Sequence, residues 1–261
     1  MRAKAIWGAQ LTLVLLCALA LKYFYSTASV NDLRWILAPT TLLVELLSGK
    51  SFEFESYMGY MSSDHTFVIA APCAGVNFLL TAFVMLALRR LWRERFQAIN
   101  WSFLPVTAVI AYAATLIANT VRIVVALYGL ELSWLTRNQV HRLEGIVVYF
   151  GFLLLLFVVI ERFESAKSSV KRLALPLLIY YATTLGIPLV NGAYRQYASF
   201  WEHFLFVLVL PLLLVLPSLL IHAFSAFIRG SRGVASDHAG AEVGVLLEPP
   251  RGAGVVRVDA F

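Results

Sequence analysis

The sequence predicts an all-α polytopic membrane protein: a bundle of about six transmembrane helices, with one interfacial or re-entrant helix and a small outer hairpin. Hydrophobic residues make up 60% of the 261 residues and charged residues only 14%, whereas soluble domains have about 45–50% and about 25%. The mean hydropathy is +0.78. Apolar runs close to the roughly 20 residues that cross a bilayer recur along the chain.

Six of these runs are read as spanning helices: 5–23, 75–91, 103–127, 146–160, 173–190 and 204–227. The first could also be a cleaved signal peptide, although its apolar stretch is long enough for an anchor. The run 33–47 is shorter and carries Arg34, Pro39 and Glu45, so we read it as the interfacial or re-entrant helix. Between 51 and 71, alternation, β-branched residues and the turn formers Ser62-Ser63-Asp64 predict the hairpin.

The last part of the chain differs in composition from the rest. Residues 229–261 are rich in Gly, Ser, Arg, Pro and Glu and have no periodic apolar face, which is typical of a disordered segment. We therefore divide the chain into a membrane-embedded domain, 1–228, and a tail, 229–261.

Basic residues are distributed unequally between the two sides of the six-span arrangement. Twelve lie on one side: Arg2, Lys4, Arg89, Arg90, Arg93, Arg95, Arg162, Lys167, Lys171, Arg172, Arg229 and Arg232. Seven lie on the other, over longer connections: Lys22, Arg34, Lys50, Arg122, Arg137, Arg142 and Arg195. Because basic residues concentrate on the cytoplasmic side, both termini and the tail are expected in the cytoplasm.

The net charge of +6 comes from these clusters beside apolar spans, not from a basic stripe interleaved with aromatics, so we expect membrane lipid and no nucleic acid as a partner. The chain has two cysteines, Cys17 and Cys73, and no CxxC pair or metal-type Cys/His cluster. We therefore expect no disulfide relay, no metal and no other cofactor.

Three reactive side chains come to one side of the predicted bundle: Cys73 before the second span, Arg122 near the end of the third, and His141 before the fourth. Ionisable groups are costly at membrane depth, so a ring of them from separate helices is a candidate functional site. Cys17 lies within an apolar run without polar neighbours and is interpreted as a packing residue.

Each of the three side chains suits a step of nucleophilic catalysis. Cys73 lies where a strand or loop turns into a helix, whose first amides would stabilise a thiolate and an oxyanion. Arg122 offers five donors for an oxyanion. His141 can take and return a proton. Each residue also has a non-catalytic interpretation: Cys73 as a small buried side chain, Arg122 as an arginine that reaches the membrane interface, and His141 as a solvated histidine.

Neighbouring residues support these three by helical spacing. Asn119 lies three residues before Arg122 and shares its face, although a helix–helix hydrogen bond is its simpler role. Glu144 lies three residues after His141 and could orient the imidazole, and Gly145 at plus four leaves room beside it. His65 is the rival base, because it lies eight residues before Cys73.

The segments Ala71-Pro-Cys-Ala-Gly-Val-Asn-Phe78, Asn119-x-x-Arg122 and His141-x-x-x-Gly145 resemble, in this order, the motifs of exosortases and archaeosortases. The resemblance covers roughly 33–160. It implies a cysteine protease or transpeptidase of the bacterial inner membrane, with its active site facing the periplasm. Its substrates would end in a short motif, a spanning helix and a basic cluster, the PEP-CTERM type of sorting signal.

Carried over by position, the resemblance makes Cys73 the nucleophile, Arg122 the charge stabiliser and His141 the acid/base, with Gly75 and Gly145 as the motif glycines. Family members commonly have Ser or Thr after the cysteine, where this chain has Ala74. This departure leaves the subfamily and the substrate motif open. The short chain and the Pro72-Cys-Ala-Gly75 segment point to a small exosortase subfamily, with exosortase K as the candidate.

Two other functions stay open at this point. A small membrane transporter could use Arg122 and His141 to line a path for an anion or a proton. A non-catalytic membrane scaffold would need none of the three side chains for chemistry. The two alternatives differ from the enzyme in predicting that removal of the Cys73 thiol is harmless.

Overall fold

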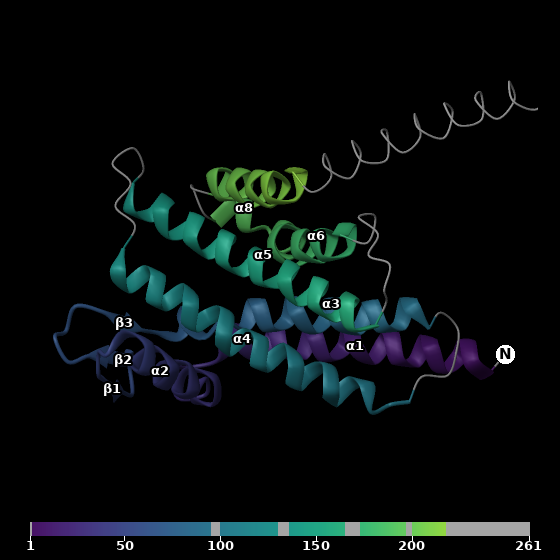
Figure 1. The fold of residues 1–261 in the computed structure, drawn as a ribbon, viewed down its shortest axis with the longest axis horizontal. Coiled ribbons are helices and arrows are strands. Elements are labelled where there is room, and N and C mark those ends of the chain that lie inside the picture. The colour runs from purple at the N-terminus through teal and green to yellow at the C-terminus, as the bar shows by residue number, and fades with distance from the viewer. Residues whose placement is uncertain (1, 95–99, 130–135, 165–172, 197–199, 218–261) are drawn as a thin grey trace, which may run out of the picture. The chain divides into compact units, whose positions relative to one another are not determined.

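The computed structural model describes residues 2–94, 100–129, 136–164, 173–196 and 200–217 (Figure 1). The chain divides into two compact units, Met1–Val215 and Leu216–Phe261, and the packing described below belongs to the first. The predicted tail 229–261 and the end of the last predicted span, 218–227, lie outside the described residues. The boundary after residue 228 therefore stays a prediction.

Five helices within the described ranges are long and apolar enough to cross a membrane, which confirms the multi-pass helical class. Four are labelled in Figure 1: α1 (Arg2–Thr27), α3 (Val76–Arg93), α4 (Phe103–Tyr128) and α5 (Arg137–Glu164). The fifth is the last described helix, Phe200–Pro217. Helix α5 begins at residue 137 instead of 146, so His141 lies inside a helix and not in the connection before it.

The run 173–190, predicted as the fifth of the six spans, is not among the five long apolar helices. It forms α6 (Ala174–Tyr181), a π-helical turn η3 (Ala182–Gly186) and α7 (Ile187–Val190), and the short α8 (Ala193–Gln196) follows. Together Ala174–Val190 make one of the shorter apolar helices. At about 1.5 Å per residue this stretch reaches roughly 25 Å, less than the hydrocarbon thickness of about 30 Å. The predicted count of six spans is therefore not confirmed.

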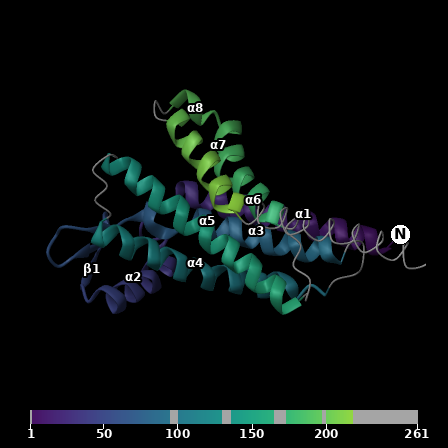
Figure 2. The same cartoon turned by 45° about the horizontal axis from the view of Figure 1, so that its top comes forward.

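Helix α3 lies at the centre of the packing. Its apolar stretch is 67% buried, against 17–33% for the other four long helices. Helix α1 runs antiparallel beside it: Trp7 Nε1 donates to the Leu91 carbonyl (2.9 Å) and Lys22 Nζ donates to Asn77 Oδ1 (2.8 Å). Figures 1 and 2 show α4 and α5 side by side next to this pair.

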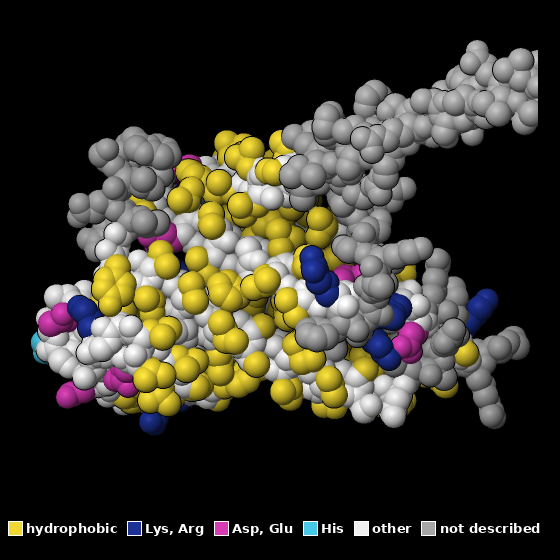
Figure 3. Space-filling model, in the orientation of Figure 1, with side chains coloured by type: hydrophobic (Ala, Val, Ile, Leu, Met, Phe, Trp, Pro, Cys, Tyr) yellow, Lys and Arg dark blue, Asp and Glu magenta, His cyan; other side chains and the backbone are white. Residues whose placement is uncertain are grey.

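The outer surface of the long helices is apolar. On α1, Leu15, Leu16 and Leu19 are 46–64% exposed. Figure 3 shows apolar side chains over the middle of the visible face and charged side chains toward its two ends. This arrangement suits a bundle whose middle contacts hydrocarbon and whose ends contact water.

Helix α2 (Arg34–Ser48) packs against α4 and is not one of the five long apolar helices. The Trp35 ring stacks on Tyr112 with 5.7 Å between centroids, and the Tyr112 hydroxyl donates to the Trp35 carbonyl (2.8 Å). The Glu45 carboxylate accepts a hydrogen bond from the Phe52 amide (2.7 Å). The charge within this apolar helix therefore secures the start of the following strand.

The predicted hairpin is in fact a three-stranded antiparallel sheet, with the order β1 (Phe52–Glu55), β2 (Gly59–Ser62), β3 (Val68–Ile69). The sequence pattern missed β2 because its four residues contain no β-branched side chain and begin with glycine. In the β2–β3 turn, Asp64 accepts hydrogen bonds from Ser62, Thr66 and Lys50. These hydrogen bonds lower the pKa of the Asp64 carboxyl well below its usual value.

An ion pair joins α3 and α5 at the end opposite the sheet. Arg89 Nη2 lies 2.7 Å from Glu161 Oε1, and Arg89 Nε donates to the same oxygen at 2.8 Å. Both side chains are buried. Because a buried charge is costly without its counter-charge, the pair fixes the register of the two helices.

We expect Arg89→Met alone to lower the free energy of unfolding by about 3–5 kcal/mol, because it removes the counter-charge of the buried Glu161 carboxylate. The double variant Arg89→Met/Glu161→Leu should be close to the wild type, since neither charge remains. Thermal unfolding of the detergent-purified proteins measures both. Equal losses in the single and the double variant would contradict the pairing argument.

Candidate active site

Cys73 lies in a short 3-10 turn, η1 (Ala71–Ala74), between β3 and α3. The Cys73 amide donates to the Ala70 carbonyl (2.8 Å), and its side chain is partly buried. Gly75 follows with φ of 71° and caps α3, whose first turn bonds back to the Gly75 carbonyl. A strand therefore leads into a helix at the cysteine, as the sequence pattern indicates.

Asn119 on α4 holds this turn from the side. It is fully buried, and its Nδ2 donates to the Cys73 carbonyl at 2.5 Å. A Cβ atom placed on Gly75 would lie 3.0 Å from Asn119 Cγ. Glycine is thus required at position 75 for two reasons: the backbone there is left-handed, and Asn119 of α4 approaches it closely.

Arg122 lies one turn further along α4 and joins two residues of α5. Its Nη1 donates to the Tyr149 hydroxyl (3.2 Å), and its Nη2 lies 3.1 Å from His141 Nε2. Its Nε is buried and has no hydrogen-bond partner among the described residues. A Cβ atom on Gly145 would lie 3.5 Å from this Nε, so the glycine gives the guanidinium room against α5.

His141 is held between a cation and a carboxylate. Because a guanidinium only donates hydrogen bonds, His141 Nε2 accepts from Arg122 and the proton of the neutral ring is assigned to Nδ1. Nδ1 lies 4.0 Å from the buried Glu144 Oε2, which is ion-pair distance and longer than a hydrogen bond. Glu144 therefore faces the nitrogen that an orienting carboxylate would contact.

Tyr149 is a site residue that the sequence reasoning missed. Its hydroxyl accepts from Arg122 and donates to Asn119 Oδ1 (2.7 Å), and its ring stacks on Phe78 with 5.3 Å between centroids. It lies four residues after Gly145 and eight after His141. This spacing puts the three residues on one helical face and was the available signal.

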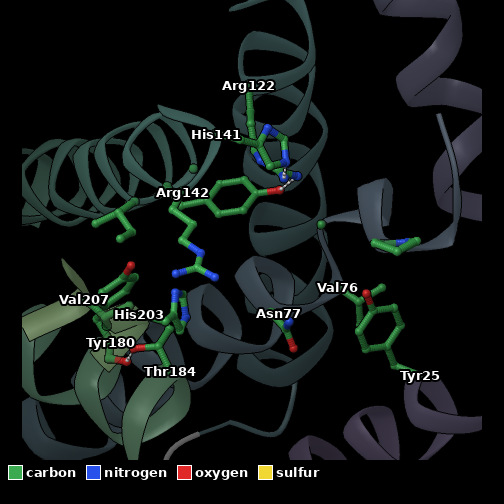
Figure 4. Close-up of a pocket in the computed structure, with 15 residues that line it drawn as sticks. Tyr25, Val76, Asn77, Arg122, His141, Arg142, Tyr180, Thr184, His203 and Val207 are labelled. Carbon is green, nitrogen blue, oxygen red and sulfur yellow. Dashed lines mark hydrogen bonds between the residues drawn. The ribbon is translucent and has the colours of Figure 1, made fainter. Parts of the chain in front are cut away.

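A cavity of about 260 Å³ opens beside these residues. It is lined by Arg122, His141, Gly145 and Tyr149, and by the neighbours of the cysteine, Pro72 and Gly75. Figure 4 shows Arg122 and His141 next to each other, with Arg142 and His203 close together further along the cavity. The cavity also receives Tyr25 from α1 and Thr184 from η3.

The structure brings Cys73, Asn119, Arg122, His141 and their motif glycines to one end of the helices. The Cys73 side chain is partly buried and packs against the hydrophobic core. Among the described residues it makes no hydrogen bond to His141, whose Nε2 faces Arg122 instead. Cys73 itself is not a lining residue of the cavity.

The rival base His65 and the second cysteine lie elsewhere. His65 is exposed in the β2–β3 turn, with φ of 54°, and is not a cavity residue. Cys17 is exposed on α1. Within the described residues, no group of three or more His, Cys, Asp or Glu side chains could hold a metal ion.

These residues define a multi-pass helical membrane protein with a cationic cavity beside a cysteine turn. One hydrogen-bonded network joins the Cys73 carbonyl, the Arg122 guanidinium and the His141 imidazole. A thiol, a guanidinium and an imidazole are the groups that nucleophilic acyl transfer uses. No family model, curated protein or solved structure matches the chain.

We expect Gly75→Ala to destabilise the protein by about 1–3 kcal/mol more than Gly49→Ala, because only at Gly75 does the new methyl group press on a packed side chain. The control is matched: Gly49 has φ of 69° but no atom within 4 Å of its Cβ position. Both variants carry the cost of a left-handed alanine. Thermal unfolding in detergent measures the difference, and equal losses would show that Asn119 does not restrict this position.

Proposed function

We propose that this chain is a membrane-embedded cysteine protease or transpeptidase of the exosortase type, which cuts C-terminal sorting signals through a thioester. One observation carries the proposal: the three sequence motifs meet through the hydrogen bonds of Asn119 with Cys73 and of Arg122 with His141. A scaffold needs no such convergence of a cysteine-containing turn, a guanidinium and an imidazole. The substrate would be a membrane protein ending in a short motif, a spanning helix and a basic cluster.

The first half-reaction forms the thioester. Docking of the substrate helix beside the bundle would bring its scissile carbonyl to Cys73. His141 Nε2 takes the thiol proton, the sulfur bonds to the carbonyl carbon, and Arg122 stabilises the oxyanion with the first amides of α3. When the carbon–nitrogen bond breaks, His141 returns the proton to the leaving amine.

The second half-reaction releases the product. Water or an amine attacks the thioester carbonyl, the carbon–sulfur bond breaks, and the Cys73 thiol is restored with the proton that His141 relays. Water gives hydrolysis and an amine gives transfer. Both outcomes use the same three side chains.

Arg122 would also gate the base in this mechanism. Without substrate its Nη2 occupies the Nε2 lone pair of His141, which is the lone pair that must accept the thiol proton. A substrate carbonyl that recruits the guanidinium releases this nitrogen. Substrate binding would therefore activate the base and form the oxyanion site in one movement.

The proposal includes a location, the bacterial inner membrane with the site facing the periplasm and both termini in the cytoplasm. We expect reporter fusions after Arg95 and Arg172 to report cytoplasm, because basic residues gather there. A membrane-impermeant maleimide should label Cys73 in spheroplasts of a Cys17→Ala strain. Periplasmic signals from both fusions would overturn this orientation.

The roles of the three residues predict different losses when C-terminally anchored substrates are followed by their size in cells. Cys73→Ala should abolish processing, whereas Cys17→Ala should behave as the wild type. His141→Ala should slow processing by about 100- to 10,000-fold. Arg122→Lys keeps the charge but loses the planar fork, so it should retain little activity.

Trapping distinguishes the enzyme from its rivals. The Cys73→Ala protein should still co-purify with uncut substrate, because the helix contacts that bind it are intact. Normal processing by Cys73→Ala would rule out the enzyme and favour a transporter or a scaffold. Cells lacking the protein should accumulate the same uncut substrates, which identifies them.

A further inference from the structure

A second cavity, of about 180 Å³, adjoins the first. The two cavities share Asn77, Thr184 and His203 as lining residues. The second is completed by Lys22 of α1 and, on its apolar side, by Leu80, Ile187 and Pro188. It therefore combines a cation with an apolar wall.

The charge around the two cavities is one-sided. Their lining residues include Lys22, Arg122 and Arg142 and two histidines, but no Asp or Glu. The nearby carboxylates are already used, since Glu202 lies 3.5 Å from Arg142 and Glu144 faces His141 from outside the cavity. A cation-lined hollow without carboxylates favours an anionic ligand.

Lys22 is the cation with capacity left for such a ligand. Its ammonium donates one hydrogen bond, to Asn77 Oδ1 at 2.8 Å, and touches no carboxylate among the described residues. An ammonium has three donors, so two are left. Because Asn77 Oδ1 accepts from Lys22, the amide nitrogen of Asn77 is a further donor at the same place. His203 adds a ring nitrogen to the lining.

The backbone at this cavity is also unusual. The wall formed by Thr183 and Thr184 belongs to the π-helical turn η3. Single π-helical turns are rare in proteins as a whole, but those that occur are frequently found at functional sites. Thr183 is tied to Thr81 of α3 by a hydroxyl pair at 2.9 Å, which keeps the wall in place beside Lys22.

We propose that this second cavity binds the phosphate group of an anionic lipid headgroup. Lys22 Nζ, Asn77 Nδ2 and His203 supply the donors, and Leu80, Ile187 and Pro188 contact the apolar part of the lipid. Basic pockets between membrane helices on the cytoplasmic side bind anionic headgroups, and the same hydrogen bonds from cations to phosphate can form at the opposite face. The site does not depend on the peptidase reaction, because none of Cys73, Arg122 and His141 lines the second cavity.

The test is native mass spectrometry of the detergent-purified full-length protein, titrated with phosphatidylglycerol or with phosphatidylcholine. The wild type should retain phosphatidylglycerol in preference. Lys22→Gln should bind it roughly tenfold or more weakly, since a hydrogen bond to a charged group is lost. Lys22→Arg should bind it nearly as the wild type does, because the charge remains.

The controls separate this site from general charge and from catalysis. Lys50→Gln removes one positive charge that is paired with Asp64 at 2.9 Å, far from the cavity lining, and should leave lipid binding unchanged. Cys73→Ala should bind lipid normally, whatever its effect on processing. His203→Gln should weaken binding and serves as a second variant if Lys22→Gln folds poorly.

Three results would overturn the proposal. Equal retention of the two lipids, or equal affinity of Lys22→Gln and the wild type, would show that the cavity does not select an anionic headgroup. In a parallel titration, inorganic phosphate should not displace phosphatidylglycerol. Displacement at millimolar concentration would overturn the lipid assignment and identify a soluble phosphate as the ligand of Lys22.

Discussion

A chain of hydrogen bonds from the Cys73 carbonyl through Asn119, Tyr149 and Arg122 to His141 joins η1, α4 and α5. A buried polar group is costly if it stands alone, so each of the buried groups in this chain needs the next. The small residues around the chain follow from it, since Gly75 and Gly145 leave the space that Asn119 and Arg122 occupy. The network therefore constrains the packing of the helix ends and the position of the cysteine together.

The two ends of the helices treat charge in different ways. At one end the Arg89 guanidinium is balanced by Glu161 within the core, so that pair has a structural role. At the other end Lys22, Arg122, Arg142 and two histidines line adjoining cavities that contain no carboxylate. The Arg89–Glu161 pair therefore serves stability at one end. The cations at the other end line cavities that can receive a ligand.

The contacts of His141 relate the proposed mechanism to the cavities beside it. Its Nε2 accepts from Arg122 and its Nδ1 faces Glu144, so the ring is oriented on both sides. On the proposed mechanism this is a resting arrangement, which an oxygen of the substrate converts by taking the guanidinium. A lipid headgroup bound in the second cavity would lie next to the first cavity. It would not cover Cys73, which lines neither cavity.

Hydropathy and helical spacing are local properties, so they were enough to predict the membrane class and three of the long helices to within a few residues. They also pointed to Cys73, Arg122 and His141 as residues at one end of the bundle. The count of six spans is not confirmed, since the run 173–190 forms a shorter apolar helix that contains a π-helical turn. The pattern missed β2, in which Tyr60 is the one residue with a clear preference for strands. Other contacts appear only in the folded chain. Tyr149 bridges Asn119 and Arg122. His141 contacts Arg122 and not Cys73, and Lys22 lines a second cavity. These contacts join residues 19 to 55 positions apart, and no local pattern encodes them.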